Sequence, residues 1–426
     1  MPRTRTPTDP VTLWLDGEAI VAQRGEPAAV ALVAAGRLAL ARSPKFHRPR
    51  GPACLAGACD GCLARVDDVP NVMTCRVPAV EGMRIETQNV VGSRETDLLR
   101  VADWFFPDGM NHHELLAGVP GVRRVVQGIA RQIAGVGRLA ALEGAGVPGV
   151  ATRPGRRREV DALVVGAGAA GMAAALELAK RGRRVEIVDD DLVAGGGAGV
   201  LARLGEPGWS GLIQAFDALV ANGSAVLRTR TTAAGVYGDD VLVASDAGGD
   251  PVEVVTARTL VLAVGCHDGS LAFEGNDVPG ILSARAGCRL LVHGVAPGRR
   301  VALVSEASPG PFGAAFARLH PEVTRVAGLP LRVTGRARVK TVVVLAGPDE
   351  REIACDALLL DAPPSPAYAL VIQAGADVAR TRAGFVVKPG PGGRIRDGVF
   401  ALGEACGAEL EPGAMMRAAS ALAALA

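Results

Sequence analysis

The stretch CLAGACDGCLARVDDVPNVMTC, from Cys54 to Cys75, places four of the eight cysteines of this 426-residue chain in one short segment. Their spacing is C-x4-C-x2-C-x12-C, with Cys59 and Cys62 as the inner pair. In the plant-type [2Fe-2S] spacing, one loop carries C-x4-C-x2-C and a distant fourth cysteine completes the ligand set. The segment therefore predicts a [2Fe-2S] cluster that is bound by all four thiolates.

Two other uses of these thiols stay open, a zinc site and unliganded cysteines. Zinc sites usually pair their thiols in two separated C-x2-C units, and this segment holds one such unit. Gly57 and Gly61 lie between the ligands. Because they have no side chain, backbone N–H groups can turn toward the sulfides, which favours the cluster.

Composition limits the function of the whole chain. The residues are 49% hydrophobic, which indicates a globular protein long enough for two or three domains. The net charge of +2 excludes the strongly basic class that binds nucleic acid or membrane surfaces. The N-terminus lacks a signal-peptide core, and no run reaches the roughly 20 apolar residues of a membrane span. We therefore expect a cytoplasmic protein, in which clustered cysteines are ligands rather than disulfides.

The residues around the cysteines predict a ferredoxin-like β-grasp domain over 10–92. A strand–turn–strand–helix order precedes the cysteines, and GMRIETQN after them is a further strand. Residues 93–158 have apolar residues at helical spacing and end in the basic ATRPGRRREV, which predicts a helical connector and linker. We expect His112 and His113 within it to lie at a solvated helix start rather than at a metal.

A second motif, EVDALVVGAGAAGMAAALELAKRGRRVEIVDDD, predicts a dinucleotide site in a strand–helix–strand unit. Gly166 allows the tight turn, Gly168 lets a pyrophosphate approach the backbone, and Gly171 lets the helix pack closely on the strand. Asp189, at the end of the second strand, is placed to accept ribose hydroxyls. Glycines that only pack an α/β unit are the alternative. Further expected site residues in this unit are Ala167, Ala170 and Asp190.

Two later segments resemble the return segments of flavoproteins with two dinucleotide-binding domains. TARTLVLAVGCHDG contains a strand that ends at Ala263 and Gly265. In those flavoproteins the corresponding segment passes near the flavin nucleotide. IRDGVFALGEACGA contains a strand that ends at Gly403 and Glu404. In those flavoproteins the corresponding segment places an acidic residue, usually Asp, at the ribityl chain. The resemblance thus implies a Rossmann-like FAD-binding domain over 159–278 and 389–426.

The residues between these segments, 279–388, predict an inserted, degenerate NAD(P)-type domain. Ser305, Glu306 and Ala307 stand where glycines are expected, and prolines interrupt the turn. We therefore expect no tight NAD(P)H binding in this domain. No C-x-x-C pair lies near it, so thiol–disulfide reductase chemistry is also excluded.

Six segments are distinctive in their amino-acid residues as well as in their spacing. They are SPKFHRPRG, TQN, DLLRVADWFFPDGM, VVGAGAAGMAAALELAKRGRRVEIVDDD, LVLAVGCHDGSLAFEGNDVPGIL and EIACDALLL. Together they resemble the alpha subunit of heterotetrameric sarcosine oxidase and its relatives among opine oxidases, hydroxyproline and proline dehydrogenases and hydrogen cyanide synthase. The long sarcosine oxidase alpha subunits lack the cluster cysteines and carry a further aminomethyltransferase-like half. With its four cysteines and its end at Ala426, this chain looks like the dehydrogenase and cyanide synthase arrangement with a fused [2Fe-2S] domain.

The resemblance implies an electron-transferring oxidoreductase subunit that contains FAD and a [2Fe-2S] cluster. In that family an amine or imino acid is oxidised at a flavin on a beta-type partner subunit, in complexes with or without a small third subunit. No catalytic residue stands out in this sequence. We expect His267 to be structural, and the alternative is that it faces a flavin or nucleotide. The alternative is a scaffold subunit that holds NAD or another adenine dinucleotide at the same site.

Overall fold

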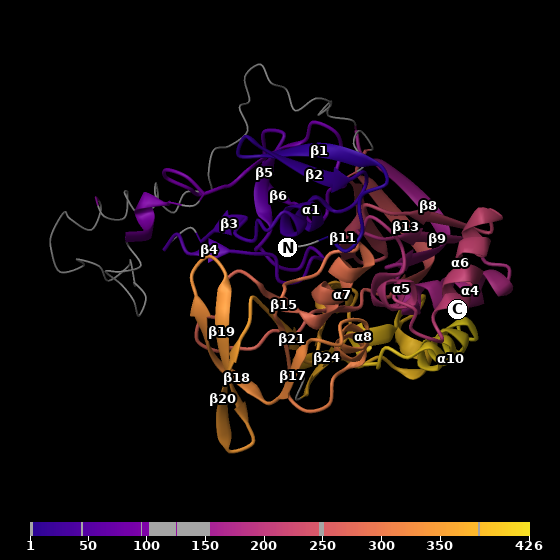
Figure 1. Ribbon diagram of the computed structural model, residues 1–426. Helices are drawn as coiled ribbons and strands as arrows, with labels where there is room; N and C mark the ends of the chain where they lie inside the picture. Colours follow the sequence, from indigo (N-terminus) through magenta and orange to yellow (C-terminus); the bar gives the residue numbers. More distant parts are fainter. Residues whose placement is uncertain are drawn as a thin grey trace.

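The computed structural model describes residues 3–43, 46–94, 96–101, 125, 154–246, 251–381 and 384–426 (Figure 1). The predicted mixed α/β class is confirmed, because parallel and mixed sheets alternate with helices along the chain. Most of the connector predicted over 93–158 lies outside the described residues, and so do His112 and His113.

The N-terminal part forms a mixed sheet in the order β2-β1-β7-β5-β6, with β1 and β7 parallel and the other neighbours antiparallel. Every residue of helix α1 is buried, because its sequence AAVALVA is small and apolar on all sides. We call this unit the β-grasp domain. Its elements are β1 (Pro10–Leu15), β2 (Glu18–Gln23), α1 (Ala28–Ala34), β3 (Ala41–Arg42), β4 (Pro49–Arg50), β5 (Leu63–Val66), β6 (Val69–Met73), β7 (Arg84–Glu86) and the 3-10 helix η1 (Leu98–Arg100).

The second sheet has the parallel core β10-β9-β8-β13-β26, and β12 and β11 extend it as an antiparallel pair. The ends of β8 and β13 read ALVV and LVL and are buried on both faces, as parallel strands between two layers require. Helix α4 packs between this sheet and α10. The elements are β8 (Arg156–Val165), α4 (Ala169–Lys180), β9 (Val185–Val188), α5 (Gly196–Arg203), α6 (Ser210–Ala221), β10 (Ala225–Arg228), β11 (Thr231–Tyr237), β12 (Asp240–Ser245), β13 (Glu253–Leu262), β25 (Arg394–Arg396), β26 (Val399–Ala401), η3 (Gly403–Cys406) and α10 (Pro412–Ala423).

The inserted segment builds a parallel sheet β15-β21-β16-β17 and an antiparallel sheet β18-β19-β20, which projects at the lower edge of Figure 1. Its core is aliphatic, with strand β16 fully buried. Its elements are β15 (Ile281–Ser283), α7 (Ala284–Val292), β16 (Val301–Ser305), α8 (Pro311–Leu319), β17 (Thr324–Ala327), β18 (Leu329–Gly335), β19 (Val339–Ala346), β20 (Asp349–Ala354) and β21 (Ala357–Asp361).

Residues 365–387 return to the second sheet before its last strands. Val371, Ala374 and Val387 pack in the same buried cluster as Leu163 of β8. On this packing we propose that the inserted domain ends near residue 361 instead of at residue 388. The elements of this return are β22 (Ser365–Pro366), α9 (Ala369–Gln373), β23 (Val378–Thr381) and β24 (Gly384–Val387). Strand β22 pairs with β14 (Cys266–His267), which follows β13, and η2 (Pro391–Gly393) comes after the return.

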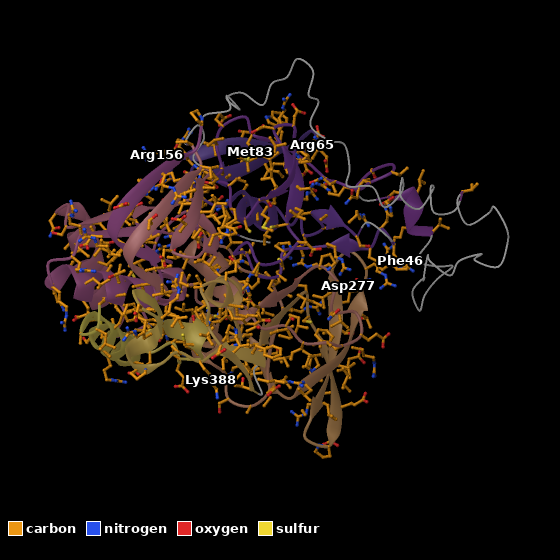
Figure 2. The ribbon with its side chains drawn as sticks, turned by 180° about the vertical axis from the view of Figure 1, so that it is seen from behind. Phe46, Arg65, Met83, Arg156, Asp277 and Lys388 are labelled. Carbon is orange, nitrogen blue, oxygen red and sulfur yellow. The ribbon has the colours of Figure 1, made fainter. Side chains whose placement is uncertain are left out.

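The β-grasp domain sits against both later parts of the chain (Figure 1). Its hydrophobic residues belong to the same buried cluster as those of α4 and α7. Arg50 and Asp277 form an ion pair at 3.1 Å between Nη1 and Oδ2, and Figure 2 shows Asp277 where the β-grasp domain meets the inserted domain. The loop that carries the first three cluster cysteines is therefore held between domains rather than at a free end.

Candidate functional site

The four predicted cluster cysteines lie together in two pairs. The Sγ atoms of Cys54 and Cys59 are 3.3 Å apart, and those of Cys62 and Cys75 are 3.4 Å apart. Two thiolates on one tetrahedral metal with bonds of about 2.3 Å lie roughly 3.7 Å apart. Each pair is thus close to the separation that one iron requires, and two adjacent pairs fit a two-iron cluster.

Backbone N–H groups of the same loop point at the sulfur atoms. Cys54 Sγ accepts from the N–H groups of Ala56 and Ala58, each at 3.4 Å, and Cys75 Sγ accepts from Gly57 N–H at 3.2 Å. Such donors stabilise thiolate charge and tune the potential of iron–sulfur clusters. A Cβ atom on Gly61 would lie 1.8 Å from the carbonyl oxygen of Gly51, so only glycine allows this loop to close.

The two thiols of each pair shift each other's pKa. A hydrogen bond from the partner thiol lowers the pKa of Cys59 to about 5, and the same effect lowers the pKa of Cys62. The hydrogen bond raises the pKa of Cys54 and Cys75 in return. Cysteines bind metal as thiolates, so metal binding would deprotonate both thiols of each pair.

The glycine fingerprint occupies the turn from β8 to α4. Gly166 has φ +99°, and a Cβ on it would lie 2.3 Å from the carbonyl oxygen of Ala263. A Cβ on Gly171 would lie 1.8 Å from the carbonyl oxygen of Gly166. Gly168 differs, because a Cβ there would meet nothing within 4 Å. Two of the glycines thus serve packing, while Gly168 faces open space at the N-terminus of α4, where a pyrophosphate would bind.

Asp189 closes this turn from the end of β9. Its carboxylate accepts hydrogen bonds from Ala167 N–H at 2.5 Å and Asp191 N–H at 2.8 Å. Burial raises the pKa of Asp189 to about 6 despite these hydrogen bonds. The carboxylate lies at the wall of the same cavity as Gly168, as an acceptor for ribose hydroxyls requires.

One cavity of about 430 Å³ brings the two motifs together. Its walls include the fingerprint turn, the ends of β9 and β13, and part of the loop that binds the cluster. From the β-grasp domain come Ala56, Gly57, Ala58 and Arg76. The cluster loop and the dinucleotide turn therefore face the same space, although more than 100 residues separate them in the sequence.

A partly buried network of charges forms another part of the cavity wall. Arg285 pairs with Glu404, and its guanidinium lies 4.5 Å from the ring of Phe312. Arg289 Nη1 donates to Asp268 Oδ2 at 2.9 Å and to the carbonyl oxygen of Cys54 at 2.5 Å. This network thus connects the backbone of a cluster ligand to the residue that we expected at the ribityl chain.

The inserted domain carries its own carboxylate at the broken fingerprint. Asp361 Oδ2 accepts from Gly310 N–H, at the start of α8, at 2.7 Å. Burial raises the pKa of Asp361. The carboxylate occupies the helix start that a pyrophosphate would use, which gives a physical reason for the expected loss of tight NAD(P)H binding there.

Most, but not all, of the residues expected at the dinucleotide line the cavity. Ala167 and Gly171 lie behind the turn and do not line it. His267 lines it and is exposed, whereas burial raises the pKa of its neighbour Cys266 to about 12 and keeps that thiol protonated. The expected residues that line the cavity are Gly166, Gly168, Ala170, Asp189, Asp190, Ala263, Gly265, Gly403 and Glu404.

Sequence reasoning missed three arginines, Arg76, Arg285 and Arg289. The last two lie one turn apart on α7, directly after strand β15, and this spacing on a helix that follows a strand was an available signal. Arg76 directly follows a cluster ligand, and the sequence gives no sign that its side chain leaves the β-grasp domain.

Comparisons with known proteins agree with this arrangement. Residues 8–90 match the family model of the 2Fe-2S iron-sulfur cluster binding domain, and residues 160–304 match that of pyridine nucleotide-disulphide oxidoreductases. Together they indicate a [2Fe-2S] cluster and FAD, which the thiol pairs and the space at Gly168 fit. Among the described residues, no helix is both long and apolar enough to cross a membrane.

Relatives cover different parts of the chain. The sarcosine oxidase alpha subunit of Rhizobium meliloti (strain 1021) is 29% identical over 71% of this chain, which spans 32% of that protein's length. Hydrogen cyanide synthase subunit HcnA of Pseudomonas aeruginosa is 33% identical over 18% of this chain and 75% of its own. The L-proline dehydrogenase from P. horikoshii shares the fold, with a TM-score of 0.69 and 23% identity over 95% of this chain and 70% of its own.

The two family models, the paired thiols and the shared cavity lead to one assignment. The chain is a sarcosine oxidase alpha-like oxidoreductase, an iron–sulfur flavoprotein in which a [2Fe-2S] domain precedes the FAD-binding fold.

Proposed function

We propose that this chain transfers electrons between FAD and the [2Fe-2S] cluster within an amine or amino-acid dehydrogenase or oxidase complex. The observation that carries the proposal is the shared cavity, whose wall includes Ala56, Gly57 and Ala58 of the cluster loop as well as the dinucleotide turn. FAD accepts electrons in pairs and can release them singly, whereas the cluster carries one.

The residues of the chain have distinct parts in this proposal. Cys54, Cys59, Cys62 and Cys75 hold the cluster. Gly168 and the N-terminus of α4 hold the pyrophosphate, and Asp189 binds the ribose.

The substrate class and the partners rest on the named relatives. Sarcosine, proline, hydroxyproline, glycine and opines are the candidates, and we propose that their oxidation occurs on a beta-type FAD-dependent partner subunit, in a complex with or without a small third subunit. Purification of the tagged complex from the native source, mass spectrometry of the partners and assays with each amine would test this. Recovery of the chain alone, without any amine-oxidising partner, would contradict it.

A second candidate function is a scaffold that holds NAD as a fixed ligand at the same site. It is favoured by Glu404, which stands where flavoproteins usually have Asp and is already paired with Arg285. The absorbance spectrum of the purified protein separates the two candidates. Flavin bands together with those of the cluster support electron transfer, and bound NAD without flavin supports the scaffold.

A further inference from the structure

Arg76 leaves the β-grasp domain and reaches the dinucleotide site. It follows the cluster ligand Cys75, yet its Nη2 donates to Asp190 Oδ2 at 2.8 Å, and its Nη1 lies 3.3 Å from Asp191 Oδ1. Its side chain is 20% exposed and lines the shared cavity. Asp190 and Asp191 directly follow Asp189, the residue expected at the ribose.

The charges around the cavity require a cation at this end. Five carboxylates line the cavity and only three guanidinium groups oppose them, although a dinucleotide adds its own negative charges. These charged residues are Asp189, Asp190, Asp191, Asp268, Glu404, Arg76, Arg285 and Arg289. Without Arg76, the adenosine end would present three carboxylates and no cation to an anionic ligand.

Arg76 also differs from the other two arginines in its remaining hydrogen-bonding capacity. Arg285 is held by Glu404, and Arg289 is held by Asp268 and the backbone of Cys54. Among the described residues, Nη1 of Arg76 is buried and has an ion-pair neighbour but no hydrogen-bond acceptor. Buried guanidinium N–H groups normally find an acceptor, and a phosphate suits their planar fork.

We propose that Arg76 is a nucleotide-binding residue, whose guanidinium binds the adenosine diphosphate part of the dinucleotide across the domain interface. The inference rests on the dinucleotide site of the proposed function. The bound nucleotide then contacts both domains, so its binding holds the cluster loop against the FAD-binding fold. It also places one cation beside both a cluster ligand and the nucleotide.

The test is a titration of nucleotide-free protein with FAD, and separately with NAD, monitored by flavin fluorescence or calorimetry. We expect Arg76→Gln to weaken binding by about ten- to a hundredfold, the range of a lost hydrogen bond to a charged group. Arg76→Lys keeps the charge but not the planar fork, so its affinity should lie between those of Arg76→Gln and the wild type. Arg65→Gln is the matched control, since Arg65 lies in the same domain (Figure 2). Its Nη1 donates to the carbonyl oxygen of Asp68.

Iron content is measured in every variant, because Arg76 adjoins a cluster ligand. Asp190→Asn supplies a second test that leaves the β-grasp domain unchanged, and by freeing the guanidinium it should tighten FAD binding several-fold. Wild-type affinity in Arg76→Gln, or weaker binding in Asp190→Asn, would overturn the inference. Gly168→Val distinguishes a failure of the proposed dinucleotide site from a failure of the role of Arg76. If Gly168→Val abolishes binding while Arg76→Gln does not, the dinucleotide binds at the proposed site and only the role of Arg76 is wrong.

Discussion

Gly168→Val tests whether the space beside the fingerprint belongs to a ligand. Gly168 has φ −76° and ψ −170°, a backbone conformation that any residue adopts, and a Cβ there meets no atom within 4 Å. We therefore expect the free energy of unfolding of the nucleotide-free variant to lie within about 1 kcal/mol of the wild-type value. A branched side chain should nevertheless occupy the space of the pyrophosphate and prevent FAD binding.

The expected size of the effect follows from binding linkage. FAD at a hundred times its Kd stabilises the wild type by about 2.7 kcal/mol, which is roughly 5–10 °C in the unfolding midpoint of a domain of this size. The unfolding midpoint of Gly168→Val should not rise when FAD is added, and the variant should not retain flavin. Thermal unfolding with and without added FAD, together with flavin absorbance after gel filtration, measures both.

Gly171→Ala is the matched comparison. Its Cβ would lie 1.8 Å from the carbonyl oxygen of Gly166, so it should destabilise the protein by about 1–3 kcal/mol or more even without ligand. If Gly168→Val keeps its flavin and the full thermal shift, the dinucleotide does not bind at this turn. If it destabilises the nucleotide-free protein as much as Gly171→Ala does, Gly168 only serves packing.

Three further changes test other parts of the account. Gly61→Ala should abolish the iron content and the [2Fe-2S] EPR signal, because its Cβ would meet the carbonyl oxygen of Gly51 at 1.8 Å; an intact signal would refute the loop geometry. Glu253 is buried among three arginines, which hold its pKa at about 2 against the opposing effect of burial. Glu253→Gln should therefore destabilise the protein by about 3 kcal/mol at pH 7 in urea unfolding. This deficit should shrink as the pH falls from about 4.5 toward 2, where the carboxylate of the wild type is protonated, and a deficit independent of pH would contradict it. Arg289→Gln removes a cation that donates to the carbonyl oxygen of Cys54, so an EPR redox titration should give a more negative cluster potential; an unchanged potential would show that Arg289 does not act on the cluster.

The parts of the candidate site that the structure brings together as the sequence predicts depend on local spacing. The spacing of the four cysteines favours a single loop that gathers them, and the structure brings their thiols into two pairs. The glycine fingerprint lies between a buried strand and a helix, as its pattern of ALVV followed by small residues indicates. Both motifs are short enough for their own sequence to fix the backbone.

The parts that the sequence does not predict depend on contacts between distant segments. Arg76 pairs with Asp190 across 114 residues, and Arg285 pairs with Glu404 across 119. Nothing in either local sequence specifies these partners, because they are set by how the domains pack. The sequence predicted residues 365–387 within the inserted domain for the same reason, since Val371 and Ala374 are ordinary apolar residues, and only their packing in the buried cluster of the second sheet supports the proposed boundary.

The central claim is that the [2Fe-2S] cluster lies on the path by which electrons leave FAD. Its most direct test is Cys59→Ser in the purified complex, followed by stopped-flow absorbance of the flavin during turnover with the amine substrate and the physiological acceptor. Oxygen is a poorer ligand for iron than sulfur, so the variant should lose the cluster and keep its FAD. We predict that reduction by the amine remains near the wild-type rate and that reduced flavin accumulates because its reoxidation is slowed. Turnover with that acceptor at the wild-type rate would contradict the account and place the cluster off the electron path.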